Sequence, residues 1–306
     1  MKRKLIKLAE KTLVVSLPTD WIITQGLTKG DELDLNIDDY KIEITPPQKI
    51  LPHKSITINV EGVKDRVLRW EISSLHKKGY DEIIIVNFNE HQNKLVEELI
   101  RDLFVGFIIK EKSSLRLVVG QIAAVDVKEF DATLRRAFRH LKEISIELET
   151  AFKNKDVELL KQQVEYEHTN NKLTNFCERL LNKHLKQKEE GHFFYVLAWN
   201  LEKIADNFKY IANHYETKPV ISDDALKIYS ELRVYLEEYT KIFFNFNIQK
   251  LVKLSEQKKN LESKIIDVLI DGSKQDRVFI HYMHMVVLQL ADFSASMIAI
   301  KLSTIL

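Results

Sequence analysis

The sequence contains little cysteine, and this excludes several classes of protein. A single cysteine, Cys177, stands among 306 residues, which excludes an internal disulfide framework and a zinc ribbon. Its neighbours are typical of a half-buried helix, so we expect a core thiol rather than a nucleophile. No stretch approaches the roughly 18–20 consecutive apolar residues of a membrane span, and the N-terminus lacks the features of a secretion signal. We therefore expect a cytoplasmic protein without membrane insertion.

Charge of one sign is also lacking over the chain as a whole. Lys and Arg number 46 and Asp and Glu 45, for a net charge of +1, so no global field indicates a polyanionic partner. Residues 1–11 differ, because they carry five basic side chains and one acid, Glu10. The basic residues are Lys2, Arg3, Lys4, Lys7 and Lys11. They form a local basic patch.

Glycine and proline are scarce and unevenly placed. Six of the eight glycines lie before residue 125, and of the five prolines only Pro219 lies after it. The first part of the chain must therefore turn often, whereas the second need not. This asymmetry predicts a multidomain α+β protein made of residues 1–46, 47–126 and 127–306.

The first two blocks alternate short strands with helices. Residues 1–46 predict four short strands and one or two helical turns between Pro18 and Gly26. So small a unit buries little apolar surface alone, and we expect it to need a second copy. Residues 47–126 predict a small β-α-β-α-β-β domain with some parallel pairing. No glycine-rich phosphate loop follows its strands, so a nucleotide-binding fold is not indicated.

The third block is almost entirely helical. Its only breakers are Gly191, Pro219 and Gly272. They predict helices over residues 131–153, 155–186, 192–215, 221–245, 247–270 and 274–304. The spacing of the breakers favours two three-helix repeats, at about 127–216 and 219–306.

Two carboxylates interrupt the apolar pattern of the segment NLEKIADNFKYIANH, residues 200–214. Glu202 and Asp206 are four residues apart, and like charges at this spacing cost about 0.2–0.5 kcal/mol unless something neutralises them. A bound cation would remove that cost, since hard and borderline cations accept carboxylate oxygens. The alternative is a solvated helix face, on which Lys209 pairs with one of the two acids.

The phrase LEKIADNFKYIA, within that segment, resembles the signature helix of the PhoU family of phosphate-uptake regulators. That resemblance covers residues 127–306 and implies a six-helix bundle with metal ions, typically iron or zinc, held on its surface. Glu202 and Asp206 match the first motif. In the second motif Asp292 is present, but Leu288 occupies the other carboxylate position, so that half departs from the family. His281 could replace the missing acid there, or be an ordinary surface or core histidine.

Residues 3–46 resemble the AbrB/SpoVT family of swapped-hairpin DNA-binding domains. The resemblance is carried by SLP at 16–18, Trp21, KGDELDL at 29–35 and the final IEITP. It implies a homodimer in which two chains interleave their hairpins and contact double-stranded DNA. Phosphate contacts by basic side chains supply most non-specific affinity for DNA. The candidate DNA-binding residues are Arg3, Lys4, Lys7 and Lys11; strand alternation makes Arg3 and Lys7 the best pair, which Lys11 can join.

Together these features predict a DNA-binding transcriptional regulator of phosphate uptake, with a helical domain that senses a metal or a protein partner. The alternative is a PhoU-type interaction module that restrains a phosphate transporter, through its subunits, without binding DNA. A metal-dependent hydrolase would need paired metal ions, and the second motif is incomplete. No nucleophile elbow or Cys/His pair is present, so we expect no enzymatic activity.

Overall fold

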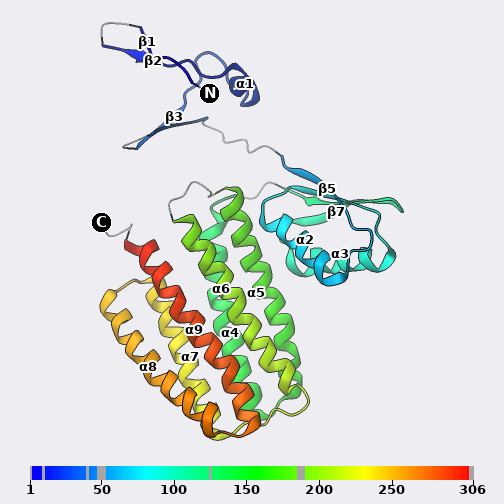
Figure 1. Cartoon of the computed structure of the whole chain (residues 1–306), viewed down its shortest axis with the longest axis vertical. Coiled ribbons are helices and arrows are strands. Elements are labelled where there is room, and N and C mark those ends of the chain that lie inside the picture. The colour runs from blue at the N-terminus through cyan, green and yellow to red at the C-terminus, as the bar shows by residue number, and fades with distance from the viewer. Residues whose placement is uncertain are drawn as a thin grey trace. The chain divides into compact units, whose positions relative to one another are not determined.

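The computed structural model describes residues 2–8, 11–38, 41–46, 53–123, 126–184 and 190–302. The chain divides into two compact units, Met1–His53 and Lys54–Leu306. Figure 1 shows short strands and one small helix in the first unit, and a sheet with two helices beside a long helical bundle in the second.

The first unit contains two separate β-hairpins. Strands β1 (Ile6–Lys7) and β2 (Leu13–Val14) pair antiparallel, as do β3 (Asp34–Asp38) and β4 (Lys41–Thr45). Helix α1 (Thr19–Thr24) lies between the hairpins in sequence and is followed by Gly26 at a φ of 66°, which favours glycine. This order of elements is the one that the sequence predicts.

Hydrophobic side chains of the first unit are exposed rather than buried. Among its described residues only Pro46 is buried. The large hydrophobic residues that are 45–73% exposed are Leu5, Ile6, Leu8, Leu13, Val15, Ile23, Leu35, Ile37 and Ile42. The described residues of a single copy of this unit therefore form no core of their own. The predicted swapped-hairpin dimer involves a second chain and stays a prediction.

The second unit begins with a mixed four-stranded sheet. Its elements are β5 (Ser55–Asn59), α2 (Asp65–Lys77), β6 (Glu82–Val86), α3 (Glu90–Leu103), β7 (Phe107–Lys112) and β8 (Arg116–Gln121). The strand order is β5-β6-β8-β7, with β5 parallel to β6 and β8 antiparallel to both of its neighbours. Apolar residues of α2 and α3 pack against the sheet, where Ile83 and Ile85 are completely buried. The predicted β-α-β-α-β-β order is confirmed.

Six long helices form the rest of the second unit. They are α4 (Glu129–Asn154), α5 (Val157–Lys183), α6 (Gly191–Tyr215), α7 (Asp223–Phe244), α8 (Ile248–Asp271) and α9 (Lys274–Leu302). Their limits agree with the predicted helices to within three residues. Asp156, Ser222 and Asn247 accept backbone hydrogen bonds as N-caps of α5, α7 and α8. At Gly272 a Cβ would meet the Val268 carbonyl oxygen at 2.4 Å, so this breaker has a steric reason.

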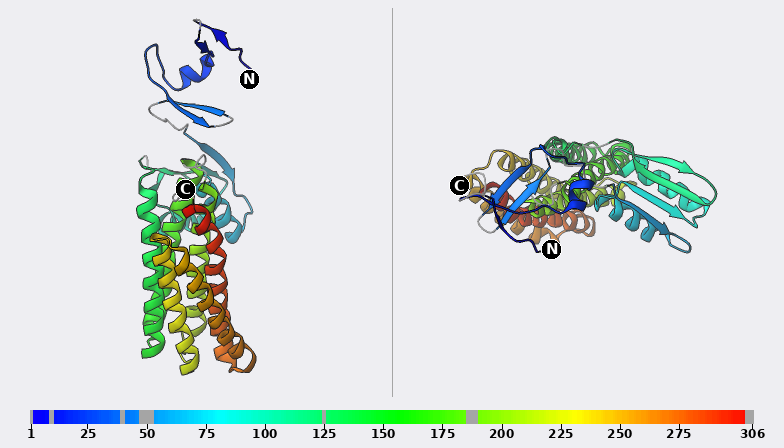
Figure 2. Two further views of the ribbon diagram at one scale, coloured as in Figure 1. Left: turned by 90° about the vertical axis from the view of Figure 1, so that its left-hand side faces the viewer. Right: turned by 90° about the horizontal axis from the view of Figure 1, so that it is seen from above.

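The helices are arranged as two sequential triplets. Helix α5 packs against α4 and α6, and α8 packs against α7 and α9; the triplets join where α6 meets α9 and α4 meets α7. Figure 2 shows the helices running along one common direction. Equivalent helices thus occupy equivalent positions in the two triplets, as a two-fold repeat of three-helix units predicts.

Helix α9 has an unusual composition for its place in the bundle. It is the one helix among the described residues that is long and apolar enough to cross a membrane. Length and composition are weak evidence of a span, because a core helix of a soluble bundle passes the same test. Helix α9 packs against α6, α7 and α8 through buried residues such as Phe279, Leu290 and Phe293.

Candidate functional site

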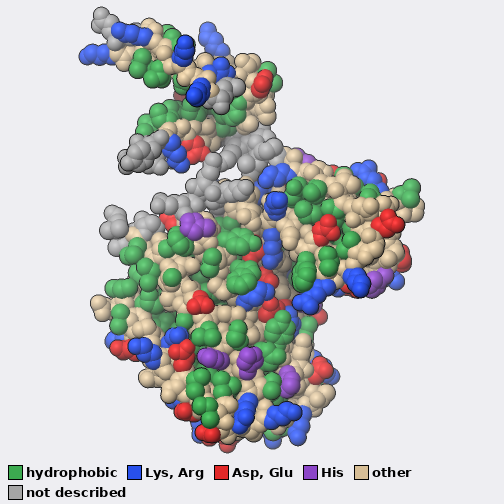
Figure 3. Space-filling view, viewed as in Figure 1, with side chains coloured by type: hydrophobic (Ala, Val, Ile, Leu, Met, Phe, Trp, Pro, Cys, Tyr) green, Lys and Arg blue, Asp and Glu red, His purple; other side chains and the backbone are tan. Residues whose placement is uncertain are grey.

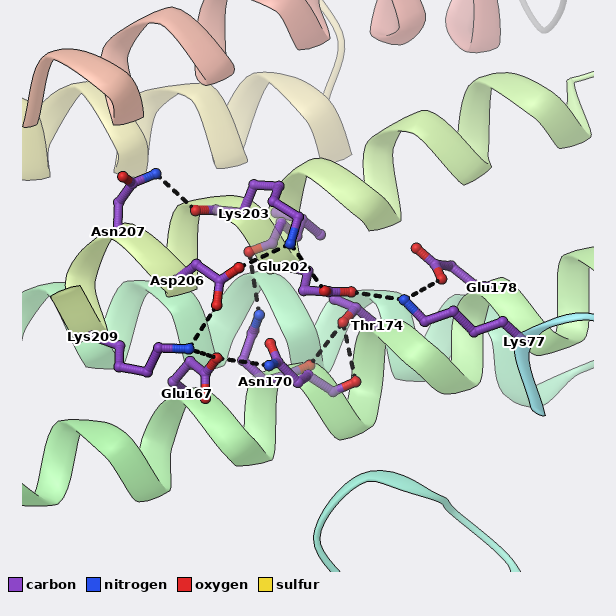
Figure 4. A network of polar contacts seen from close by, with 12 residues as sticks. Lys77, Glu167, Asn170, Thr174, Glu178, Glu202, Lys203, Asp206, Asn207 and Lys209 are labelled. Atoms are coloured by element: carbon purple, nitrogen blue, oxygen red, sulfur yellow. Dashed lines mark hydrogen bonds and ion pairs between the residues drawn. The ribbon is translucent and has the colours of Figure 1, made fainter. Parts of the chain in front are cut away.

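Glu202 and Asp206 lie on one flank of α6, with side chains only 15% and 13% exposed. The Lys203 ammonium bridges them, with Nζ 3.2 Å from Glu202 Oε1 and 2.9 Å from Asp206 Oδ2. Figure 4 shows this arrangement. The carboxylates therefore flank the core stripe, as the helical periodicity predicts, but they are not solvated.

Lys209 extends the network from α6 to α5. Its Nζ lies 2.8 Å from Asp206 Oδ1 and also contacts Glu167 Oε1. Glu167 is almost entirely buried on α5, where the Asn171 amide donates a hydrogen bond of 2.7 Å to the same oxygen. The expected pairing of Lys209 with an acid of this helix is thus confirmed, and a second carboxyl group joins it.

The third cation comes from a different part of the fold. Lys77, in the last turn of α2, places its Nζ 3.0 Å from Glu202 Oε2 and 2.9 Å from Glu178 Oε2. Glu178, on α5, is completely inaccessible to solvent. A lysine of the α/β region therefore neutralises two acids of the helical bundle (Figure 4).

The network contains four carboxyl groups and three ammonium groups, so full ionisation would leave an excess negative charge. Burial, with the neighbouring Asp206 carboxylate, raises the pKa of Glu167 to about 7. Burial would also raise the pKa of Asp206, but hydrogen bonds from Glu167 and the two lysines outweigh it and lower that pKa. Glu167 is accordingly the group of this pair that holds a proton near neutral pH.

A buried arginine fixes the α/β region to the bundle beside this network. Arg179 of α5 is 2% exposed and donates to the carbonyl oxygens of His76 (2.9 Å) and Tyr80 (2.7 Å). It also donates to Asp81 Oδ1 at 3.0 Å and Gln121 Oε1 at 2.9 Å. Buried charges are tolerated only when paired and hydrogen-bonded in this way. These bonds therefore hold the C-terminal end of α2, and Asp81 just before β6, against α5.

The predicted metal ligands are not gathered into a cluster. Asp292 is exposed on α9, whereas lysine ammonium groups occupy the positions beside Glu202 and Asp206 that a cation would take. Within the described ranges, no group of three or more His, Cys, Asp or Glu side chains could hold a metal ion. His281, the candidate replacement, is exposed. This geometry does not fit the iron or zinc ion that the PhoU resemblance implies. The metal site therefore stays a prediction that the geometry does not support.

The four candidate DNA-binding residues lie in or beside the first hairpin. Lys7 is in β1, Arg3 and Lys4 precede it, and Lys11 lies in the connection to β2; all four are exposed. The strand is shorter than the sequence predicts, with Ile6 opposite Val14 and Lys7 opposite Leu13. Their role in binding DNA stays a prediction.

Residues of the interdomain contact were missed by sequence reasoning. The pattern of the segment RWEISSLHKKGYDEIIIV, which includes Lys77 and Asp81, predicts a helix and a strand but assigns them no role, and Arg179 lies in an ordinary helical pattern. Only the doublet Glu178–Arg179, beside the predicted core thiol, offered a signal of buried charge. Cys177 itself is buried, as predicted, and burial raises the pKa of its thiol.

Comparisons with known proteins give limited likeness. No family model and no curated protein matches this chain. A solved structure similar to it is the phosphate transport system regulatory protein PhoU from Streptococcus pneumoniae, with 12% sequence identity and a TM-score of 0.47. The match covers 57% of this chain and 94% of that one. A likeness of this size carries no argument about function.

Proposed function

We propose that this chain is a DNA-binding transcriptional regulator that acts as a homodimer. The observation that carries the proposal is the first unit, which exposes nine large hydrophobic side chains and the four candidate DNA-binding residues Arg3, Lys4, Lys7 and Lys11. Neither property suits a free monomeric unit, and both suit a dimer that binds a polyanion.

Association through the exposed hydrophobic residues supplies the missing core. Burying apolar surface contributes roughly 25 cal/mol per Å², or about 1.5–3 kcal/mol for each large aliphatic side chain that becomes fully covered. Leu35, Ile37 and Ile42 lie in one hairpin, 58–73% exposed. In a symmetric pair the same residues of both chains are covered, so the free energy of burial is gained once in each chain. This favours a symmetric pair over a contact with an unlike protein.

Such a pair would bring two copies of the basic patch onto one body. Lysine and arginine side chains bind DNA phosphates, and each contact displaces condensed counterions. The patch contains no aromatic side chain between its charges, so stacking on single-stranded bases is not expected. Double-stranded DNA is the partner that this chemistry favours.

We infer phosphate uptake as the regulated process from the sequence likeness of residues 201–212 to the PhoU signature. In this proposal the first unit contacts the promoter and the helical bundle senses an effector; the lysines beside Glu202 and Asp206 favour a protein partner over the metal that the signature implies. The second candidate is an interaction module that restrains a transporter without touching DNA. The near-neutral net charge of +1 is compatible with it.

Binding of the full chain to its own promoter DNA across a salt series tests the proposal. We expect salt-dependent binding, and Arg3→Ala with Lys7→Ala should reduce the slope of log K against log salt by about 0.9 for each lost phosphate contact. The matched control is Lys29→Ala with Lys41→Ala in the same unit. Binding that does not depend on salt concentration, or equal slopes for both double variants, would refute the role in DNA binding. Co-purification with transporter subunits would then favour the second candidate.

Elemental analysis tests the metal-sensing part separately. Iron or zinc near one ion per chain in the wild type, lost in Glu202→Gln with Asp206→Asn, would establish the site. Equal metal content in both proteins would remove it and leave a protein partner as the effector.

A further inference from the structure

Helix α9 is apolar on a side that the described residues of the second unit do not cover. Its most apolar window of 18 residues has a mean hydropathy of 1.6, yet only 39% of that window is buried. A helix that is apolar all round is normally enclosed by protein or lipid. The outward side includes Met285, which is 38% exposed, and Leu302, 44% exposed. The described residues of the second unit leave this side open to another body.

The neighbouring helix α6 continues the same uncovered face. Its outward residues Val196, Trp199 and Tyr210 are 42–46% exposed. Helices α6 and α9 pack side by side, and Figure 3 shows hydrophobic side chains over the part of the bundle where both helices face the viewer in Figure 1. We call the outward surface of these two helices the α6–α9 face.

The spacing of the outward residues is that of a helix–helix contact. On α6 they fall at 196, 199, 203 and 210, and on α9 at 285, 288, 292, 295, 299 and 302. The steps are three, four and seven on α6, and steps of three and four alternate on α9. Side chains repeating in this way form the seam along which one helix packs against another.

The register between the two helices follows from two hydrogen bonds. The Asn207 amide donates to Gln289 Oε1 at 3.0 Å, and the Tyr215 hydroxyl donates to the Gln275 carbonyl oxygen. Residue numbers rise on α9 as they fall on α6, so the helices are antiparallel. One turn from the first bond, Lys203 and Asp292 are therefore at the same level.

The same register pairs large residues of α6 with small ones of α9. Moving along the helices from Lys203 and Asp292, Trp199 is level with Ala295, and Val196 is level with Ala299. A two-fold axis parallel to the helices would place α6 of one copy on α9 of another without changing these levels. Large side chains would then meet small ones, and a lysine would meet an aspartate.

We propose that the α6–α9 face is a contact with the same face of a second copy of this chain. Trp199 and Val196 of one copy pack over Ala295 and Ala299 of the other, and Lys203 faces Asp292. An exposed aspartate in the middle of the apolar stripe is unfavourable against lipid but complements a lysine. This contact is additional to the proposed dimer of the first unit, and uses different residues.

Disulfide trapping between two preparations tests the contact. Full-length Val196→Cys is mixed with full-length Ala299→Cys under mild oxidation; the native Cys177 is buried and does not compete. In the control mixture Val252→Cys replaces Val196→Cys; Val252 lies on α8 and is 49% exposed. We expect the mixed disulfide of the first mixture to form at least tenfold faster than that of the control mixture. Equal rates for the two mixtures would overturn the proposal.

The trapping is repeated with Ile37→Asp in both chains, which separates this contact from the proposed function. Persistence of the fast cross-link in that background supports an independent contact, and its loss overturns it, whatever happens to DNA binding. As a second measurement, Asp292→Lys should weaken self-association in that background about tenfold, whereas Asp267→Lys, an exposed aspartate of α8, should not. Co-sedimentation with phosphatidylglycerol vesicles that is abolished by Leu288→Asp would instead assign the face to a membrane and overturn the proposal.

Discussion

The two compact units treat similar residues in opposite ways. In the first unit Leu35 is 58% exposed and Ile37 73% exposed, whereas in the second Leu141 and Ile204 are completely buried. A domain is stable when it removes enough apolar surface from water to offset the loss of chain entropy. The second unit does so within one chain. The described residues of the first unit do not, which is why we propose that it associates with a second copy.

Charged residues show the same contrast. The lysines that the structure describes in the first unit are exposed, whereas Lys77 and Lys209 of the second are mostly buried, each between two carboxyl groups. Exposed ion pairs contribute little, but breaking a buried pair leaves an uncompensated charge. Substitutions of the same kind should therefore have very different effects in the two settings.

The largest effect is expected at the buried arginine. Arg179→Met should lower the free energy of unfolding by about 3–5 kcal/mol, because it removes a cation from Asp81 and leaves buried carbonyl oxygens without donors. Urea denaturation followed by circular dichroism measures the change. Arg69→Met is the control, since its ion pair with Glu98 is 44% and 47% exposed and should contribute less than about 1 kcal/mol. Similar losses of unfolding free energy for both variants would show that the buried contacts of Arg179 contribute no more than an exposed ion pair.

The next effect concerns pH. The folded-state pKa of Glu167 is raised from the ordinary value of 4.5 to about 7, so its contribution is fully present below about pH 4.5 and is lost as pH rises through about 7. Glu167→Gln cannot release a proton and should remove up to about 3 kcal/mol of pH dependence between pH 4.5 and 7.5. Thermal unfolding across that range checks this. Glu165→Gln, an exposed neighbour on α5, should leave the profile unchanged.

A smaller effect is expected in the first unit, and it concerns association rather than folding. Ile37→Asp should weaken the homodimer by roughly 2 kcal/mol, since it replaces an apolar side chain that we expect to be covered. Unfolding of the helical unit should not change. Sedimentation equilibrium gives the dimer constant, with Val252→Asp as a control of comparable starting chemistry. A neutral outcome would mean that this hairpin faces water in the assembled protein.

The smallest effect is at a helix terminus. The Asn89 side chain accepts a hydrogen bond from the Gln92 backbone N–H, and the Gln92 side chain accepts one from the Asn89 backbone N–H, whereas α1 has no side-chain cap. Asn89→Ala should cost about 1 kcal/mol of unfolding free energy. Thr19→Ala at the start of α1 should be close to neutral. Chemical denaturation measures both variants. A larger loss of unfolding free energy in Thr19→Ala than in Asn89→Ala would contradict this comparison.

Local patterns were enough to predict the elements of this protein. Gly191, Pro219 and Gly272 divide the third block because they disfavour a continuing helix, and the strands of residues 55–121 alternate or run apolar as buried strands do. The exposed state of the first unit also follows from its size, since a block of 46 residues with short strands cannot enclose its own hydrophobic side chains. These properties depend on neighbours within a few residues.

The site was decided by contacts between distant segments. Helical spacing places Glu202 and Asp206 on one flank of α6 and allows Lys209 to pair with an acid there, and both features are present. It could not supply Lys77, which is 125 residues before Glu202, or the burial of Glu178 against the α/β region. Whether an acidic pair binds a metal, a proton or a lysine depends on the groups packed around it. Sequence periodicity reports the face of a helix, whereas only tertiary packing determines what that face meets.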